Sequence, residues 1–103
     1  MRVIVSRQVK EFLETEKRYL RKHSNTAHRR LAARLRETLR MLADFPLAGA
    51  ERPLPVPGLR RFVVDDYVVD YEVSEHELHI LAMRHGRQRD PYVEIDDDAD
   101  FEA

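Results

Sequence analysis

A cluster of cationic side chains lies at residues 84–89, where four cationic or titratable groups fall within six positions. Two further arginines stand together at the start of an earlier strand-like run. The two groups are Arg84, His85, Arg87 and Arg89, and Arg60 and Arg61. Guanidinium groups donate paired hydrogen bonds that match the oxygens of phosphates and carboxylates. We therefore expect these six side chains to form a positive rim that binds such groups on a target molecule.

The same six side chains also have a purely structural interpretation. Long cations at the end of a strand can hydrogen-bond backbone carbonyls and pair with Asp and Glu, which are abundant in this chain. For any single member of the group both roles stay open. The rim hypothesis concerns the group as a whole.

Metal and cofactor chemistry is not expected from the remaining residues. The chain contains no cysteine, so neither disulfides nor thiolate ligands are available. His76 and His79 are three positions apart, which on a strand directs them to opposite faces. His79 and His85 share a face of a regular strand, but at ~3.3 Å per residue they are about 20 Å apart. We find no nucleotide-binding or nucleophile-elbow motif and predict neither a metal site nor a cofactor.

Three strand-like runs form the predicted scaffold of the rim. Residues 59–65 make the first run, and residues 67–73 alternate with the period of a half-buried strand. Residues 78–83 are apolar on both faces for part of their length, which is typical of a central strand. Short polar stretches separate the runs, so we predict an antiparallel three-stranded meander.

The amino-terminal half is predicted to form a short strand followed by an antiparallel helical hairpin. Residues 2–5 are an apolar run, and Ser6 can cap the next helix by accepting a hydrogen bond from a backbone amide. Apolar residues recur with helical spacing over residues 7–22, where Glu16 falls in the apolar phase. A second apolar stripe begins at Leu31 and must end at Pro46. Residues 46–58 contain four prolines and two glycines and are expected to be an ordered but irregular connection.

Length and composition indicate one α+β domain. A chain of 103 residues buries roughly two thirds of its unfolded surface, enough for a single core. We assign residues 1–95 to this domain and residues 96–103 to an acidic tail. No apolar run approaches the ~18 residues of a membrane span, and the amino terminus lacks the core of a signal peptide. A cytoplasmic location without membrane contact is therefore expected.

Charge is distributed unevenly, although the net charge is only −1. Residues 1–42 hold twelve Lys or Arg and four Asp or Glu, a balance of +8, whereas residues 43–89 balance at −2 and residues 90–103 at −7. The basic hairpin could meet an acidic protein or nucleic acid, or its cations could simply be solvated. Direct nucleic-acid binding stays an open alternative.

The order of elements resembles the ParE/RelE superfamily of bacterial toxins from type II toxin–antitoxin systems. The resemblance rests on GLRR at residues 58–61 entering the meander, YVVDY at 67–71 in its middle and HGRQRD at 85–90 closing it, and it covers nearly the whole chain. It implies a RelE/ParE-like fold, with a two-helix hairpin packed on a small antiparallel sheet. It also implies a toxin that halts growth and is neutralised by a cognate ParD-like antitoxin in a hetero-oligomer.

The two branches of this superfamily differ in activity. RelE-like members cut messenger RNA on the ribosome, whereas ParE-like members act on DNA gyrase and are not known to be enzymes. Arg61, Arg87 and Tyr92 match three positions of the RelE-like pattern, but Val68 stands where that pattern has an arginine. A missing charge opposite a transition-state oxyanion costs ~2.7–4 kcal/mol. We therefore favour the ParE-like branch and a non-catalytic toxin, with the RelE-like endoribonuclease and a non-toxic interaction module as alternatives.

Antitoxin binding is predicted for a groove between the hairpin and the sheet. The two apolar helical stripes exceed what a small meander can cover, so part of them could receive an amphipathic helix. The candidate residues are Tyr19, Leu31, Leu35 and Leu39. The alternative for each is an ordinary place in the core.

Overall fold

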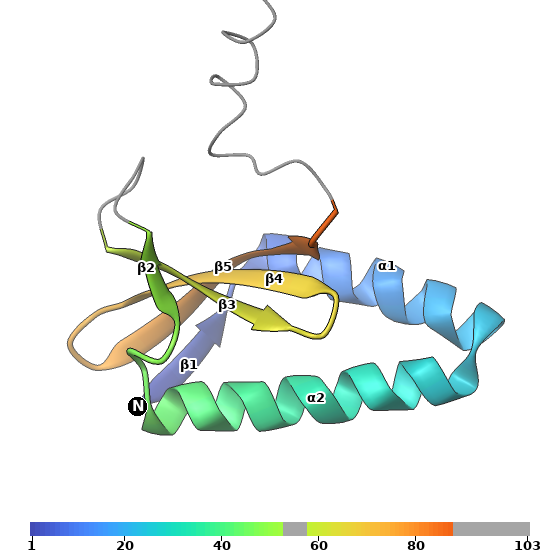
Figure 1. The fold of residues 1–103 in the computed structure, drawn as a ribbon, viewed down its shortest axis with the longest axis horizontal. Coiled ribbons are helices and arrows are strands. Elements are labelled where there is room, and N and C mark those ends of the chain that lie inside the picture. Colours follow the sequence, from blue (N-terminus) through green and yellow to red (C-terminus); the bar gives the residue numbers. More distant parts are fainter. Residues whose placement is uncertain (53–57, 88–103) are drawn as a thin grey trace, which may run out of the picture.

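The computed structural model describes residues 1–52 and 58–87, which form two helices and a five-stranded sheet (Figure 1). In chain order the elements are β1 (Arg2–Val5), α1 (Arg7–His23), α2 (Asn25–Asp44), β2 (Ala50–Arg52), β3 (Leu59–Val64), β4 (Tyr67–Val73) and β5 (Glu77–His85). The predicted α+β fold is confirmed. The acidic tail predicted at residues 96–103 and its boundary at residue 95 lie outside the described residues. Neither described helix is long and apolar enough to cross a membrane.

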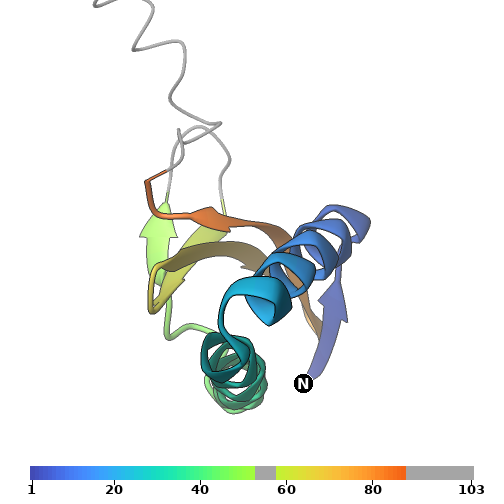
Figure 2. The ribbon, with the colours of Figure 1, turned by 90° about the vertical axis from the view of Figure 1, so that its right-hand side faces the viewer.

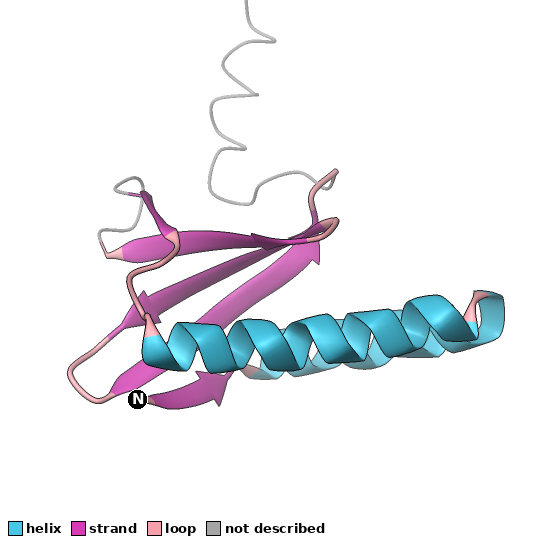
Figure 3. Ribbon diagram, turned by 60° about the horizontal axis from the view of Figure 1, so that its bottom comes forward, coloured by secondary structure: helices cyan, strands magenta, loops and turns pink. Residues whose placement is uncertain are grey.

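Serine side chains fix the start of both helices. The Ser6 hydroxyl accepts a hydrogen bond from the Val9 amide at 3.3 Å, and the Ser24 hydroxyl accepts one from the Ala27 amide at 3.1 Å. Each of these bonds satisfies a backbone donor that has no partner within its own helix. α1 and α2 are separated only by Ser24, and they lie side by side against the same face of the sheet (Figures 2 and 3).

The sheet has the strand order β1-β5-β4-β3-β2. The predicted meander is present as β3-β4-β5, and β5 lies between two strands, as its two-sided apolar pattern indicated. Two details differ from the expectation. β1 runs parallel to β5, so the sheet is mixed rather than wholly antiparallel. Part of the segment expected to be irregular forms β2, which pairs with β3 over three residues, too few to produce a recognisable alternation.

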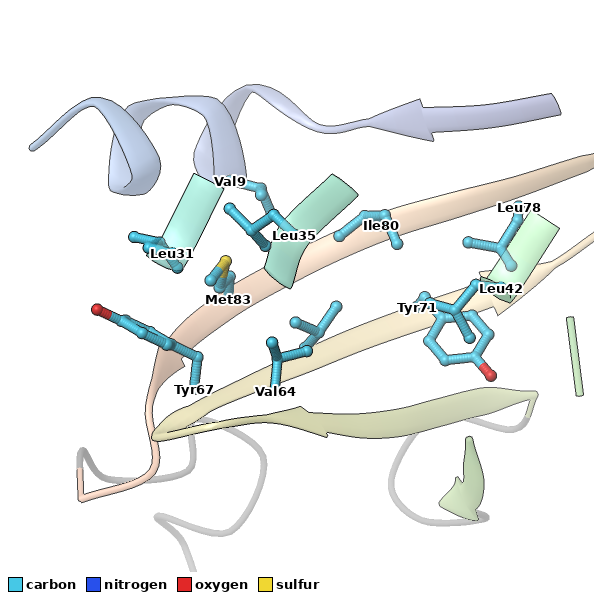
Figure 4. Close-up of a cluster of buried hydrophobic side chains, with 11 residues drawn as sticks. Val9, Leu31, Leu35, Leu42, Val64, Tyr67, Tyr71, Leu78, Ile80 and Met83 are labelled. Carbon is cyan, nitrogen blue, oxygen red and sulfur yellow. The ribbon is translucent and has the colours of Figure 1, made fainter. Parts of the chain in front are cut away.

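The core lies between the helical hairpin and one face of the sheet (Figure 4). Apolar side chains from α1 and α2 meet those of β3, β4 and β5, and most of them are almost completely buried. The core residues are Val9, Leu31, Leu35, Leu42, Val64, Tyr67, Val69, Tyr71, Leu78, Ile80 and Met83. Leu31 and Leu35, two residues proposed from sequence for antitoxin contact, therefore belong to this core, with exposed fractions of 3% and 9%.

A bulge in β5 changes which residues face the core. Asp70 pairs with Ala82 and Tyr71 pairs with Ile80, so Leu81 has no opposite residue in β4. Before the bulge Ile80 faces the helices, and after it Met83 does. His85, two positions beyond Met83, consequently points to the helix side of the sheet. The regular strand assumed from the sequence would have directed His85 to the other face.

The connection from α2 to β2 is held by side chains of the sheet. The hydroxyl of Tyr71 donates to the Pro46 carbonyl at 2.9 Å and accepts from the Gly49 amide at 2.8 Å. Nη1 of Arg60 donates to the carbonyls of Gly49 and Leu47 at 2.7 and 3.3 Å. These four hydrogen bonds explain why the segment is ordered although its large apolar side chains, Phe45 and Leu47, are exposed.

Candidate functional site

The end of β5 brings together three of the six side chains predicted to form the rim. Arg84 and His85 end the strand, and Arg87 follows in the turn after it. The amide of Gly86 donates to the carbonyl of Asp66 at 2.7 Å, which fastens this end of β5 to the turn between β3 and β4. Arg89, and Tyr92 of the nuclease-like alternative, lie outside the described residues.

An open groove of about 690 Å³ runs beside this strand end. Its lining combines apolar, acidic and cationic side chains: Val63, Asp65, Asp66, Val68, His85, Gly86 and Arg87. Val63 is 60% exposed, although it lies on a strand. A groove with an apolar floor and charges of both signs suits a protein surface better than a small anion alone.

His85 is held by a carboxylate on the helical hairpin. Its Nε2 lies 3.0 Å from Oε2 of Glu16, whose side chain is only 12% exposed. The ring also lies against the rings of Tyr67 and Phe12, with centroid distances of 4.9 and 5.9 Å. Nε2 of His85 thus lies within hydrogen-bonding distance of this carboxylate oxygen.

Glu16 also accepts a hydrogen bond from the Tyr67 hydroxyl, at 2.6 Å. One carboxylate oxygen therefore links α1 to both β4 and β5 at the end of the sheet that carries the cations. Sequence reasoning did not include Glu16 among the site residues. The available signal was its place in the apolar phase of α1, where a carboxylate needs partners if it is buried.

Burial and the hydrogen bond to Glu16 raise the pKa of the Tyr67 hydroxyl well above its ordinary value. A tyrosine in the unfolded chain ionises near pH ~10, whereas the folded state holds this proton to higher pH. The stability that follows is therefore complete below about pH 10 and is lost as the pH rises above that value.

Alkaline unfolding should reveal this contribution. We expect the free energy of unfolding to fall above pH ~10 by up to about 1.4 kcal/mol per pH unit from this group, and Tyr67→Phe should remove that part of the slope. Urea unfolding at several pH values between about 8 and 11 measures it. Tyr19→Phe, at an exposed tyrosine of α1, is the matched control. An unchanged slope in Tyr67→Phe would contradict the assignment.

Arg84 and Arg87 differ in their surroundings. Arg84 is partly buried, and its Nη1 donates to the backbone carbonyl of His85 at 3.2 Å. Arg87 is exposed and lines the groove, and within residues 1–52 and 58–87 no hydrogen bond or ion pair reaches its side chain. Arg87 is thus the member of the strand end best placed to bind another molecule.

Arg60 and Arg61 lie farther along the sheet and are engaged within the fold. Arg61 forms a bidentate ion pair with Asp70, with Nε to Oδ1 at 2.7 Å and Nη2 to Oδ2 at 3.1 Å. Asp70 is 2% exposed, so this pair is largely removed from water. Arg60 holds the carbonyls of Leu47 and Gly49, as described above. Both arginines thus make the contacts of the structural alternative, in which cations bind backbone carbonyls or pair with a carboxylate.

The four residues proposed for antitoxin contact occupy different environments. Tyr19 is 56% exposed and lies against the His23 ring at 4.2 Å. Leu39 is partly buried and, with Leu35, lines an apolar cavity of about 40 Å³ between the helices and the sheet. Leu31 lies at the base of a surface hollow of about 470 Å³, near the hairpin turn. This hollow is also lined by Leu20, Ala27, Arg30, Asp65, Asp66 and Tyr67.

Comparisons with known proteins agree with the geometry. A family model described as "ParE toxin of type II toxin-antitoxin system, parDE" matches residues 3–90. A relative from Sinorhizobium fredii named "Putative toxin Y4kP" is 31% identical over 77 residues, which make up 73% of this chain and 77% of that protein. A solved structure titled "Chromosomal ParDE TA system from P. aeruginosa" covers 82% of this chain and 95% of its own, with a TM-score of 0.66 and 20% identity. At that identity the solved structure supports the fold.

Proposed function

This chain belongs to the ParE toxin family of type II toxin–antitoxin systems, and from that premise we propose that it inhibits growth by binding DNA gyrase without cutting nucleic acid. The observation that carries the proposal is a difference in environment between Arg87 and Arg61. Arg87 is exposed at a groove with an apolar floor, whereas Arg61 is bound by a buried carboxylate. A binding surface needs an exposed arginine such as Arg87. A ribonuclease of the alternative branch would need both Arg87 and Arg61 to be available to the RNA.

The alternative nuclease is disfavoured on energetic grounds. Catalysis of RNA cleavage requires cations aimed at the charge that develops on the phosphate. Arg61 would have to leave Asp70, and removing one partner of a buried ion pair costs roughly 3–5 kcal/mol. Val68, at the position of a further expected cation, is 9% exposed and helps to line the groove.

Selective binding is the physical mechanism of the proposed inhibition. A ligand shifts a conformational equilibrium only by the difference in its affinity for the two states. We infer that the surface formed by Arg84, His85 and Arg87 binds the DNA-cleaved state of gyrase more tightly than its other states. Glu16 acts here as a positioning residue, because it fixes the His85 ring at one edge of the groove.

Gyrase inhibition should depend on Arg87. Loss of one charge-assisted hydrogen bond costs at least about 1.5 kcal/mol, so Arg87→Ala should raise the concentration needed for half-inhibition of supercoiling roughly tenfold. Purified gyrase and relaxed plasmid provide the assay. Arg18→Ala is the control, because Arg18 is exposed on α1 and pairs only with Glu14 among the described residues, at 3.6 Å.

Two results would count against gyrase as the target. The first is an absence of inhibition by the unmodified protein at any soluble concentration. The second is toxin-dependent cleavage of messenger RNA on purified translating ribosomes, which would favour the RelE-like alternative. Both assays use the same protein preparation. Activity in one assay therefore shows that the protein is folded, and its inactivity in the other then reflects the target.

A cognate ParD-like antitoxin is the proposed partner that neutralises the toxin. The hollow near the hairpin turn has an apolar base at Leu20 and Leu31 and charged residues at its edge. Such a surface suits an amphipathic helix, and Tyr19 and Leu39 extend the candidate surface along the hairpin. Growth arrest on induced expression, relieved by co-expression of the neighbouring reading frame, is the observation expected in cells.

A further inference from the structure

The outer side of the helical hairpin carries two rows of cations that have no partner within residues 1–52 and 58–87. One row is on α1 and the other on α2, and five of the six side chains are exposed while Lys17 is half-buried. The α1 row is Lys10, Lys17 and Arg21, and the α2 row is Arg29, Arg36 and Arg40. In each row the spacing is i, i+7 and i+11, which keeps the three side chains within about 40° around the helix axis.

The two rows lie on the neighbouring helices of the hairpin. Lys10 and Lys17 neighbour Leu13 on the surface of α1, and Leu13 lines the apolar cavity together with Leu39 of α2. The α2 row lies roughly opposite the buried stripe of α2, which is Leu31, Leu35, Thr38 and Leu42, and so occupies the outward face of that helix. With axes roughly 8–10 Å apart, as for packed helices, the rows form a double track of positive charge.

The carboxylates of the hairpin do not neutralise this double track. Glu11 lies 3.8 Å from Arg7, Glu14 lies 3.6 Å from Arg18, and Glu37 lies 3.6 Å from Arg34. None of these arginines belongs to the two rows. Glu16 is directed into the core, toward Tyr67 and His85. The remaining carboxylate of the hairpin, Asp44, is exposed at the end of α2 four positions after Arg40, and no ion pair joins these two described residues. The six cations of the rows outnumber the carboxylates near them, so the outer side of the hairpin keeps an excess of positive charge.

We propose that this double track binds the phosphate backbone of duplex DNA without reading its sequence. Duplex DNA presents one negative charge per ~1.7 Å of its axis, so cations spaced roughly 6 and 10 Å apart along each helix can each have a phosphate within reach. An amphipathic protein helix fits less well, because it needs an apolar strip between the rows. The exposed large apolar residues of the described chain are Met1, Tyr19, Phe45, Leu47 and Val63, and none lies between the two rows. The proposal goes beyond gyrase binding and uses a different surface.

Salt-dependent binding to a labelled duplex of about 20 base pairs tests the proposal by fluorescence anisotropy. Each phosphate contact contributes about 0.9 to the slope of log K against log salt. The triple variant Arg29→Gln/Arg36→Gln/Arg40→Gln should reduce that slope by about 2.7 and weaken binding at least tenfold at low salt. Circular dichroism establishes that each variant is folded.

A charge-matched control is available in the same chain. The control variant Arg2→Gln/Arg7→Gln/Arg18→Gln also removes three positive charges, but from exposed arginines that pair with Glu77, Glu11 and Glu14. This control should keep most of the wild-type slope. Equal losses in both triple variants, no duplex binding by the unmodified protein at low salt, or a preference for single-stranded RNA would overturn the proposal. Supercoiling inhibition that survives in the α2 triple variant while duplex binding is lost would leave the gyrase proposal intact and show that the two surfaces act separately.

Discussion

Replacing Arg61 with alanine should lower the free energy of unfolding by about 3–5 kcal/mol, the usual cost of leaving one member of a buried ion pair without its partner. The pair is bidentate, with distances of 2.7 and 3.1 Å, and Asp70 is 2% exposed. Water cannot readily solvate the carboxylate that remains. Urea unfolding followed by circular dichroism gives the difference directly.

A double variant separates the lost ion pair from a general defect at this place in the sheet. Arg61→Met/Asp70→Asn removes both charges with little change in volume, and it should recover much of the stability lost in Arg61→Ala. Arg18→Ala breaks an exposed pair and should change stability by less than about 1 kcal/mol. A loss of that small size in Arg61→Ala would contradict the buried character of its pair with Asp70.

Gly49→Ala should destabilise the fold by about 3 kcal/mol, at the upper end of the usual cost of overpacking. A Cβ atom at this position would lie 2.6 Å from the Tyr71 hydroxyl oxygen and 2.8 Å from the carbonyl oxygen of Arg61. One neighbour is a buried ring and the other is backbone, so neither can move cheaply. The shift would also strain the hydrogen bond between the Gly49 amide and Tyr71.

Gly86→Ala is the matched comparison for this substitution. A Cβ atom there would meet the Asp66 carbonyl at 3.5 Å, an ordinary van der Waals distance. We expect a change in unfolding free energy within about 0.5 kcal/mol, as for surface substitutions in general. If the same urea titration gave similar losses of unfolding free energy for the two variants, the close contacts at Gly49 would not explain the cost of adding a side chain there.

Sequence patterns predicted the elements that depend on local chemistry. The cap at Ser6 and the break before Pro46 predicted the start of α1 and the end of α2 within a residue or so, because caps and prolines act on neighbouring backbone groups. The meander followed from alternation with period two. β2 and the parallel pairing of β1 were not predicted, because three or four residues carry too little pattern to fix a neighbour in the sheet.

The candidate site was predicted in part. Residue types pointed to residues 84–89, and the structure places Arg84, His85 and Arg87 together at the end of β5. The pairing of Arg61 with Asp70 was not apparent, since two residues nine positions apart become neighbours only after β3 and β4 pair in one particular register. Glu16 was equally hidden, because its partners Tyr67 and His85 are about 50 to 70 positions away in the sequence.

The extra residue in β5 has a consequence for comparing this toxin with its relatives. Ser6 donates from its hydroxyl to the Leu81 carbonyl at 3.0 Å, so the amino-terminal segment helps to hold the strand where its sidedness changes. A homologue that lacks one residue at this point would exchange the orientations of its counterparts of Arg84 and His85, even if every side chain of the groove were retained. An alignment gap near Leu81 is therefore a better sign of an altered groove lining than a substitution within the cationic segment itself.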